Sequence, residues 1–140
     1  MSDRRLADAE YLRASHLNQH ANGAIYLGGI ALECLLKAKL LEHHPWLQSH
    51  RGDLSGKTRE EQRIFSLCYQ KHDLTTLLEH LPSVRKRLSA VQSRRGNMLR
   101  IMSQLCAEWT IHVRYSPKTT TIAKAGSFLD SVKELSRWLR

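Results

Sequence analysis

Residues 24–40 read AIYLGGIALECLLKAKL and lie in the most apolar part of the chain. Apolar and small side chains recur there every three or four residues, which is typical of one face of an α-helix: Ile25, Gly28, Leu32, Leu35 or Leu36, and Leu40. The spacing predicts a helix from about Asn22 to His43, which Pro45 stops. Glu33 and Lys37 interrupt the apolar run, so we do not expect it to cross a membrane.

Small residues form a strip on this predicted helix at Ala24, Gly28 and Ala31. Such a strip lets another helix approach closely, although each interior glycine costs about 1 kcal/mol of helix stability. It would serve packing within the chain or a seam between two copies.

Helical spacing continues through almost all of the chain, and no stretch alternates in the manner of a half-buried strand. Helices are expected from about Asp3 to Gln19, from Thr58 through Tyr69, over LTTLLEHL after Asp73, from Ser83 with a break near Gly96–Asn97, and from about Thr121. Thr58 with Glu61 forms a capping-box pattern, and Asp73 is placed to cap the next helix. We therefore predict an all-α fold, an up-and-down bundle of four long helices plus one or two short helices. Residues 45–57, PWLQSHRGDLSGK, are expected to form an exposed loop.

Length and composition indicate one domain over residues 1–140, because 140 residues with 41% hydrophobic side chains can build one core. Lys and Arg number 22 against 13 Asp and Glu, a net charge of +9. This balance favours phosphate-bearing or otherwise acidic partners, and the alternative is a basic soluble protein without a polyanion partner.

Cysteine and histidine patterns point away from cofactor and metal chemistry. The three cysteines are far apart and have no CxxC spacing, which predicts buried thiols in a reducing cytoplasm. No histidine spacing matches a metal-ligand pattern, so we expect neither a metal nor a cofactor. The charged N-terminal residues MSDRRLADAE do not resemble a signal peptide. We expect a cytoplasmic protein without a membrane segment.

The densest basic run is VRKRLSAVQSRRGNMLR, which contains no acidic residue. Its cations are Arg85, Lys86, Arg87, Arg94, Arg95 and Arg100. A cluster of this kind can neutralise several phosphates of a nucleic acid, and binding would then fall steeply with salt. The alternative is a solvated helix face.

Arg13, His16 and His20 would share the apolar side of a continuous first helix. Inward-facing Arg and His side chains need partners, and a phosphate or a carboxylate such as Glu33 would serve. An internal hydrogen-bond network or a contact between helices of a dimer is the alternative.

Residues 108–118 read EWTIHVRYSPK. Trp109 continues an apolar stripe that starts at Met98, so we expect it to anchor the core. His112 and Arg114 would point about 200° apart on an α-helix, whereas in an extended segment they would share a side. Across a dimer axis they could also meet in trans.

Three segments together resemble the HEPN domain family: AIYLGGIALECLLKAKL at 24–40, HDLTTLL at 72–78 and WTIHVRYSP at 109–117. Within the first segment the matching run is Leu32, Glu33, Leu36, Lys37 and Ala38. The resemblance implies a small helical bundle, usually dimeric, with a link to RNA or nucleotides. Catalytic members are metal-independent endoribonucleases, often toxins opposed by a nucleotidyltransferase-like antitoxin. They carry an Arg followed after four to six residues by a His.

The chain departs from that catalytic pattern, because no His follows Arg114 and the one match, Arg13 with His20, lies in the first predicted helix. We therefore expect a HEPN-like homodimer that binds RNA, a nucleotide or a nucleotidyltransferase-like partner, without the family's ribonuclease site. Lys37, Arg114 and Tyr115 join the basic run as candidate phosphate or nucleic-acid ligands. Glu33, His72 and Asp73 are the candidate structural polar residues.

The alternative function is a metal-independent endoribonuclease acting on RNA at a dimer interface. Its candidate catalytic pairs are His112 with Arg114 and Arg13 with His20. In such a pair the His would act on the 2′-hydroxyl or the leaving oxygen, and the Arg would hold the phosphate charge.

Overall fold

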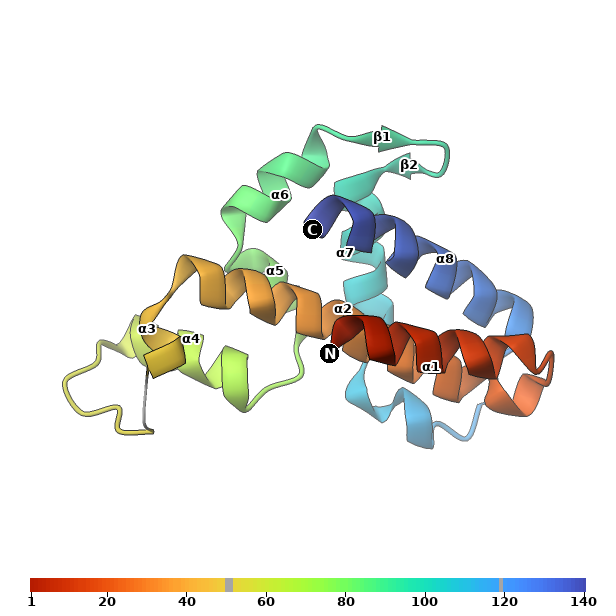
Figure 1. Cartoon of the computed structure of the whole chain (residues 1–140), viewed down its shortest axis with the longest axis horizontal. Helices are drawn as coiled ribbons and strands as arrows, with labels where there is room; N and C mark the ends of the chain where they lie inside the picture. Colours follow the sequence, from red (N-terminus) through yellow and green to blue (C-terminus); the bar gives the residue numbers. More distant parts are fainter. Residues whose placement is uncertain (50–51, 119) are drawn as a thin grey trace.

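The computed structural model describes residues 1–49, 52–118 and 120–140, which are mostly helical (Figure 1). The α-helices of this part of the chain are α1 (Ser2–Ala14), α2 (Ala21–His43), α3 (Trp46–Ser49), α4 (Arg59–Tyr69), α5 (Leu74–Glu79), α6 (Pro82–Ser89), α7 (Met98–Glu108) and α8 (Ile122–Leu139). Two 3-10 helices, η1 (Asn18–His20) and η2 (Ile111–Tyr115), and a hairpin of β1 (Gln92–Ser93) and β2 (Gly96–Asn97) complete it.

Helix α2 is the central element, because α1, α5, α8 and η2 all pack against it (Figure 1). Its apolar face is buried at Leu32, Leu36 and Leu40, and it ends at His43 before Pro45, as the spacing predicts. Gly28 lies against Phe128 and Leu129 of α8, so part of the small-residue strip serves packing within the chain.

The fold is all-α apart from the short hairpin. Among the described residues, five of its α-helices (α3 to α7) have 11 residues or fewer, where four long helices and one or two short ones were expected. α1, α2 and α8 pack together, whereas α7 packs chiefly against α5 and α6. The buried side chains of these helices nonetheless belong to one hydrophobic core.

The first helix is shorter than predicted, because α1 ends at Ala14 rather than near Gln19. The Ser15 hydroxyl donates to the carbonyl of Leu12 at 2.7 Å and accepts from the N–H of Leu17 at 3.3 Å. These local bonds compete with the helical ladder. His16 then adopts a positive φ of 56°, which ends the helical path.

The segment expected to be an exposed loop is partly folded. Trp46 to Ser49 form α3, and Leu47 is buried. The ammonium of Lys57 lies 4.4 Å from the centre of the Trp46 ring, so the two ends of the segment meet. His50 and Arg51 of this expected loop lie outside the described residues.

The predicted break near Gly96–Asn97 is a β-hairpin. Arg94 and Arg95 form its two-residue turn between Ser93 and Gly96, and Gly96 has a φ of 120° that favours glycine. The Asn97 side chain then caps α7 by accepting from the N–H groups of Leu99 and Arg100. Trp109 ends α7 and is 3% exposed, which confirms its place in the core.

Candidate nucleic-acid interface

Helix α6 carries three adjacent cations on its outer side. Val84 and Leu88, one turn apart, are buried and attach the helix to the core. Arg85, Lys86 and Arg87 fall between these positions, so all three side chains are exposed. The spacing of the two buried apolar residues thus determines that the charged side chains between them face the solvent.

The hairpin adds a fourth exposed cation. Arg94 lies in its turn and has no partner in the described structure, whereas Arg95 is held by α8. Arg95 donates to the carbonyl of Ser127 at 3.2 Å and to the hydroxyl of Ser131 at 2.9 Å. Arg100 folds back and donates to the carbonyl of Arg95 at 3.5 Å. Arg95 and Arg100 therefore position the turn that presents Arg94.

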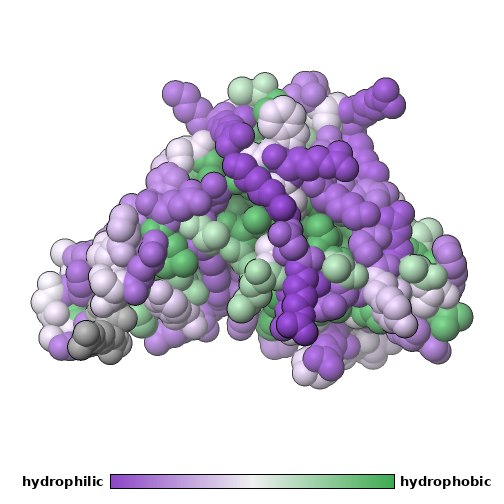
Figure 2. Space-filling view, viewed as in Figure 1, coloured by the Kyte–Doolittle hydropathy of each residue, from purple (hydrophilic) through white to green (hydrophobic). Residues whose placement is uncertain are grey.

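No acidic residue occurs between Glu79 and Glu108, so the charges of α6 and the hairpin are not neutralised along the chain. The four unpaired cations, Arg85, Lys86, Arg87 and Arg94, have no ion-pair partner within the described residues; we call them the basic surface. Figure 2 shows hydrophilic side chains projecting from the top of the molecule, where α6 and the hairpin lie. Such a surface attracts phosphate groups over a distance set by the salt concentration.

Lys37, a predicted phosphate ligand, is used inside the protein. Its ammonium lies 2.6 Å from the carboxylate of Glu33, which is 4% exposed, and donates to the carbonyl of Lys71 at 2.9 Å. His72 contacts the same carboxylate through Nδ1 at 3.0 Å. Buried carboxylates need such partners, and these three side chains join α2 to the chain that enters α5.

Asp73 lies at the N-terminus of α5. Its carboxylate accepts from the N–H of Thr76 at 3.0 Å and from the Thr76 hydroxyl at 2.7 Å. These hydrogen bonds lower the pKa of Asp73, because they favour the ionised form. The cap was predicted from the sequence, and the geometry confirms it.

Arg114 and Tyr115 lie on η2 and are exposed. The guanidinium of Arg114 is 5.7 Å from the centre of the Tyr26 ring and 5.8 Å from that of Tyr115. Glu33 is engaged by Lys37 and His72, and Arg114 lies over the two tyrosine rings instead. Tyr115 is 76% exposed beside an open hollow that His112 also lines.

His112 and Arg114 are two positions apart on a 3-10 helix, so their side chains diverge by about 120°. This differs from both backbones considered for the segment, the α-helix and the extended strand. The two side chains of one copy therefore do not converge on one phosphate.

Arg13 and His20 have separate partners. Arg13 donates to Asp130 of α8 at 2.6 Å and lies 3.5 Å from Glu10. The hydrogen bond to Asp130 raises the pKa of Arg13. His20 contacts the hydroxyl of Ser15 through Nδ1 at 2.7 Å. Because α1 ends at Ala14, the shared helical face expected for Arg13, His16 and His20 is not formed.

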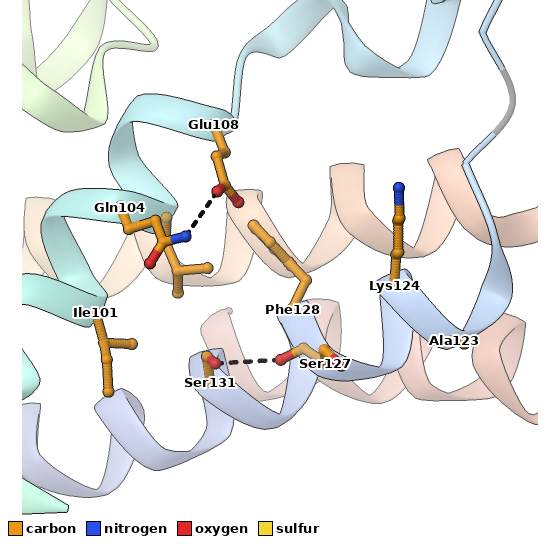
Figure 3. Close-up of a pocket in the computed structure, with 9 residues that line it drawn as sticks. Ile101, Gln104, Glu108, Ala123, Lys124, Ser127, Phe128 and Ser131 are labelled. Carbon is orange, nitrogen blue, oxygen red and sulfur yellow. Dashed lines mark hydrogen bonds between the residues drawn. The ribbon is translucent and has the colours of Figure 1, made fainter. Parts of the chain in front are cut away.

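A further hollow of about 440 Å³ lies between α7 and α8 (Figure 3). Ile101 and Phe128 lie beside the polar side chains of Gln104 and Glu108, which are hydrogen-bonded to each other at 3.0 Å. None of the predicted site residues lines it.

Comparisons of the chain with protein-family models, with curated proteins and with solved structures gave no match. Two of the three segments that resemble HEPN domains, 72–78 and 109–117, both contact the first, 24–40: His72 bonds to Glu33, and Arg114 lies over Tyr26.

Two observations bear on metal and thiol chemistry in the described structure. Across residues 1–49, 52–118 and 120–140, no three His, Cys, Asp or Glu side chains are grouped so that they could hold a metal ion. Burial raises the pKa of Cys106 to about 12, which keeps its thiol protonated at neutral pH. No helix of the described chain combines the length and apolar character of a membrane span.

One contact was not predicted from the sequence. His43, at the end of α2, lies 2.7 Å through Nε2 from the hydroxyl of Ser83 in the first turn of α6. The two residues are 40 positions apart and no local pattern links them. Only the packing of α6 near the end of α2 reveals the pair.

Proposed function

We propose that this protein is a HEPN-like helical domain that binds RNA by its phosphate backbone, using the basic surface of α6 and the hairpin. The observation that carries the proposal is the set of four exposed cations, Arg85, Lys86, Arg87 and Arg94, without acidic partners in the described structure. Cations already paired with carboxylates, such as Lys37, gain little from a phosphate because they must first give up a partner.

RNA is the polyanion that the resemblance to HEPN domains favours. The contacts of His72 with Glu33 and of Arg114 with Tyr26 support that resemblance, since residues of the matched segments meet in space. The exposed ring of Tyr115 offers a surface on which an unpaired base can stack, which suits single-stranded RNA.

The test is the binding of a labelled single-stranded RNA at several salt concentrations. The native protein should bind with a steep salt dependence, since each neutralised phosphate contributes about 0.7 to the slope of log K against log salt. Replacing Arg85, Lys86, Arg87 and Arg94 by Gln should weaken binding on the order of 10- to 100-fold and reduce the slope by about 3.

A matched control removes four exposed cations elsewhere that have no ion-pair partner among the described residues: Arg59, Lys71, Lys118 and Lys124, each replaced by Gln. Both variants then have the same net charge. If the control loses as much affinity as the basic-surface variant, only overall charge matters and the proposed interface is wrong. The same experiment with DNA of equal sequence tests the preference for RNA.

Dimerisation and a nucleotidyltransferase-like partner are further proposals drawn from the resemblance. Mass measurement in solution tests the first, and co-purification tests the second. A protein that binds the partner but shows no salt-dependent RNA binding would contradict the RNA proposal.

The endoribonuclease alternative is tested with the same RNA in EDTA. Cleavage lost in His112→Ala would assign the site to η2, and cleavage lost in His20→Ala would assign it to the Arg13 region. Intact RNA at high protein concentration would leave binding as the function.

A further inference from the structure

The hydrogen bond between Ser83 and His43 runs from the serine hydroxyl to the imidazole, as it does between a serine nucleophile and its general base. His43 Nδ1 lies 2.8 Å from the carbonyl oxygen of Lys39, and His43 Nε2 lies 2.7 Å from the Ser83 hydroxyl. A carbonyl oxygen only accepts hydrogen bonds, so Nδ1 must carry the ring proton. In the neutral ring Nε2 then has a free lone pair, and Ser83 donates its proton to it. The carbonyl of Lys39 orients the base as the third member of such arrangements does.

In a second serine and histidine pair of the same chain, the hydrogen bond runs in the opposite direction, from the histidine to the serine. His20 Nδ1 also lies 2.7 Å from a serine hydroxyl, that of Ser15. However, the Ser15 hydroxyl donates to the carbonyl of Leu12 at 2.7 Å, so its proton is already committed. His20 must therefore donate to Ser15 and cannot act as its base. The distance is the same in both pairs, but of these two serines only Ser83 has its proton directed at the histidine.

The surroundings of Ser83 contain a charge that would select a substrate. His43, Ser83 and Arg87 line one open hollow of about 210 Å³ between the end of α2 and α6. Lys39 and Glu42 also line it, and their opposite charges are paired with each other at 3.0 Å. Arg87 has no acidic partner in the described structure and is free to hold an anionic group.

Two backbone donors lie next to the nucleophile. The first N–H groups of an α-helix have no acceptor within the helix. Those of Ser83 and Val84, in the first turn of α6, have no backbone acceptor among the described residues. They lie on the element that carries the hydroxyl, and N–H donors are the groups that stabilise the charge on the oxygen of an attacked carbonyl.

We propose that Ser83 and His43 form an acyl-transfer site for small carboxylic esters that carry a negative group. Ser83 Oγ attacks the ester carbonyl while His43 Nε2 takes the hydroxyl proton. The ester C–O bond breaks, and His43 returns that proton to the leaving alcohol, which leaves an acyl group on Ser83. Water then attacks the acyl carbonyl with His43 as base, so that the acid is released and the serine regenerated. Arg87 holds the substrate's anionic group.

The first test is covalent labelling with a fluorophosphonate, which forms an O–P bond to an activated serine as fluoride leaves. Mass spectrometry of the digested protein should find the label on Ser83 and at least about 10-fold less on Ser15. His43→Gln keeps a hydrogen-bonding side chain but removes the base, and it should abolish the labelling of Ser83. Equal labelling of Ser83 and Ser15, no label on Ser83, or labelling that survives His43→Gln would each overturn the proposal.

The second test concerns the substrate class. The protein should hydrolyse the mono-4-nitrophenyl ester of succinate faster than 4-nitrophenyl acetate, and Arg87→Gln should remove that preference. The reaction should disappear in Ser83→Ala. Circular dichroism and the urea midpoint check that each variant is folded, which we expect because His43, Ser83 and Arg87 are all exposed. A preference unchanged by Arg87→Gln would remove Arg87 from the site. Neither test uses RNA, so its outcome is independent of the proposed RNA binding.

Discussion

At the scale of single residues, Gly29 and Trp109 decide how closely the end of α7 approaches α2. The indole of Trp109 lies directly over Gly29, and a Cβ built on this glycine would overlap three atoms of the ring. Trp109 is buried in a close-packed core, so its ring has less room to move aside than a surface side chain would have. Glycine is therefore needed at position 29 because the Trp109 ring leaves no room for a Cβ, and not because of its backbone conformation.

We predict that Gly29→Ala destabilises the protein by about 2 kcal/mol, although alanine favours a helix by about 1 kcal/mol over glycine. Urea unfolding followed by circular dichroism measures the change. Gly23→Ala in the same helix is the control, because its Cβ would meet only the end of the Leu12 side chain at 3.1 Å. A stabilised Gly29→Ala variant would show that Trp109 does not lie where the structure places it.

At the scale of elements, short helices such as α5 depend on their first turn. A helix of this length has too few backbone bonds to be stable alone. Asp73 satisfies the N–H of Thr76, and Leu74, Leu77 and Leu78 bury the helix against the core. The cap and the apolar side chains together make the element.

Replacing Asp73 by Ala should cost about 1 kcal/mol of folding stability at neutral pH, as the loss of an N-cap usually does. Asp73→Asn keeps an acceptor and should cost only part of that. Because the folded-state pKa of Asp73 is lowered, its ionic contribution is present above the unfolded pKa of about 3.9 and is lost as the pH falls through the folded value.

The stability difference between the native protein and Asp73→Asn should therefore shrink below about pH 4. Denaturant unfolding at pH 7, 4 and 3 measures it. A difference that stays constant over this range would contradict the assigned role of the charge.

At the scale of the whole molecule, Asp130 of α8 connects parts of the chain that are far apart in sequence. Its carboxylate binds Arg13 of α1 at 2.6 Å and lies 3.4 Å from Arg95 of the hairpin. Partial burial raises the pKa of Asp130. The hydrogen bond and charge of Arg13, together with the charge of Arg95, lower it by more than burial raises it. The pKa of Asp130 is thus held below its ordinary value.

We predict that Asp130→Asn loosens α1 and the hairpin together. Amide hydrogen exchange should become faster in residues 92–97 and in the last turn of α1, and less so in α4. Asp8→Asn is the control, since the one ion pair of Asp8 within the described residues is with Arg5 on the same helix. Unchanged exchange in the hairpin would show that Arg95 is held by Ser127 and Ser131 alone.

The same linkage predicts reduced stability in acid. The contribution of ionised Asp130 is complete above the unfolded pKa of about 3.9 and disappears as the pH falls through its lowered folded value. Its effect should be modest, because the side chain is partly exposed and screened by solvent.

The sequence by itself determined the features that repeat or act locally. The spacing of Leu32, Leu36 and Leu40 predicted α2, Thr58 with Glu61 predicted the start of α4, and the apolar stripe predicted that Trp109 is buried. These features depend on the helical period and on neighbours three or four residues away. Both can be seen in a short stretch of the sequence. The hairpin escaped prediction because two-residue strands have no period to detect.

Only the tertiary structure decided which polar groups meet. It paired Arg13 with Asp130 rather than Glu33, committed Lys37 to Glu33, and placed Ser83 against His43. Each choice depends on how helices distant in sequence pack, and a charge pattern alone cannot show whether a cation is free or already neutralised. For this reason the basic run could be read from the sequence, but its division into structural and available cations could not.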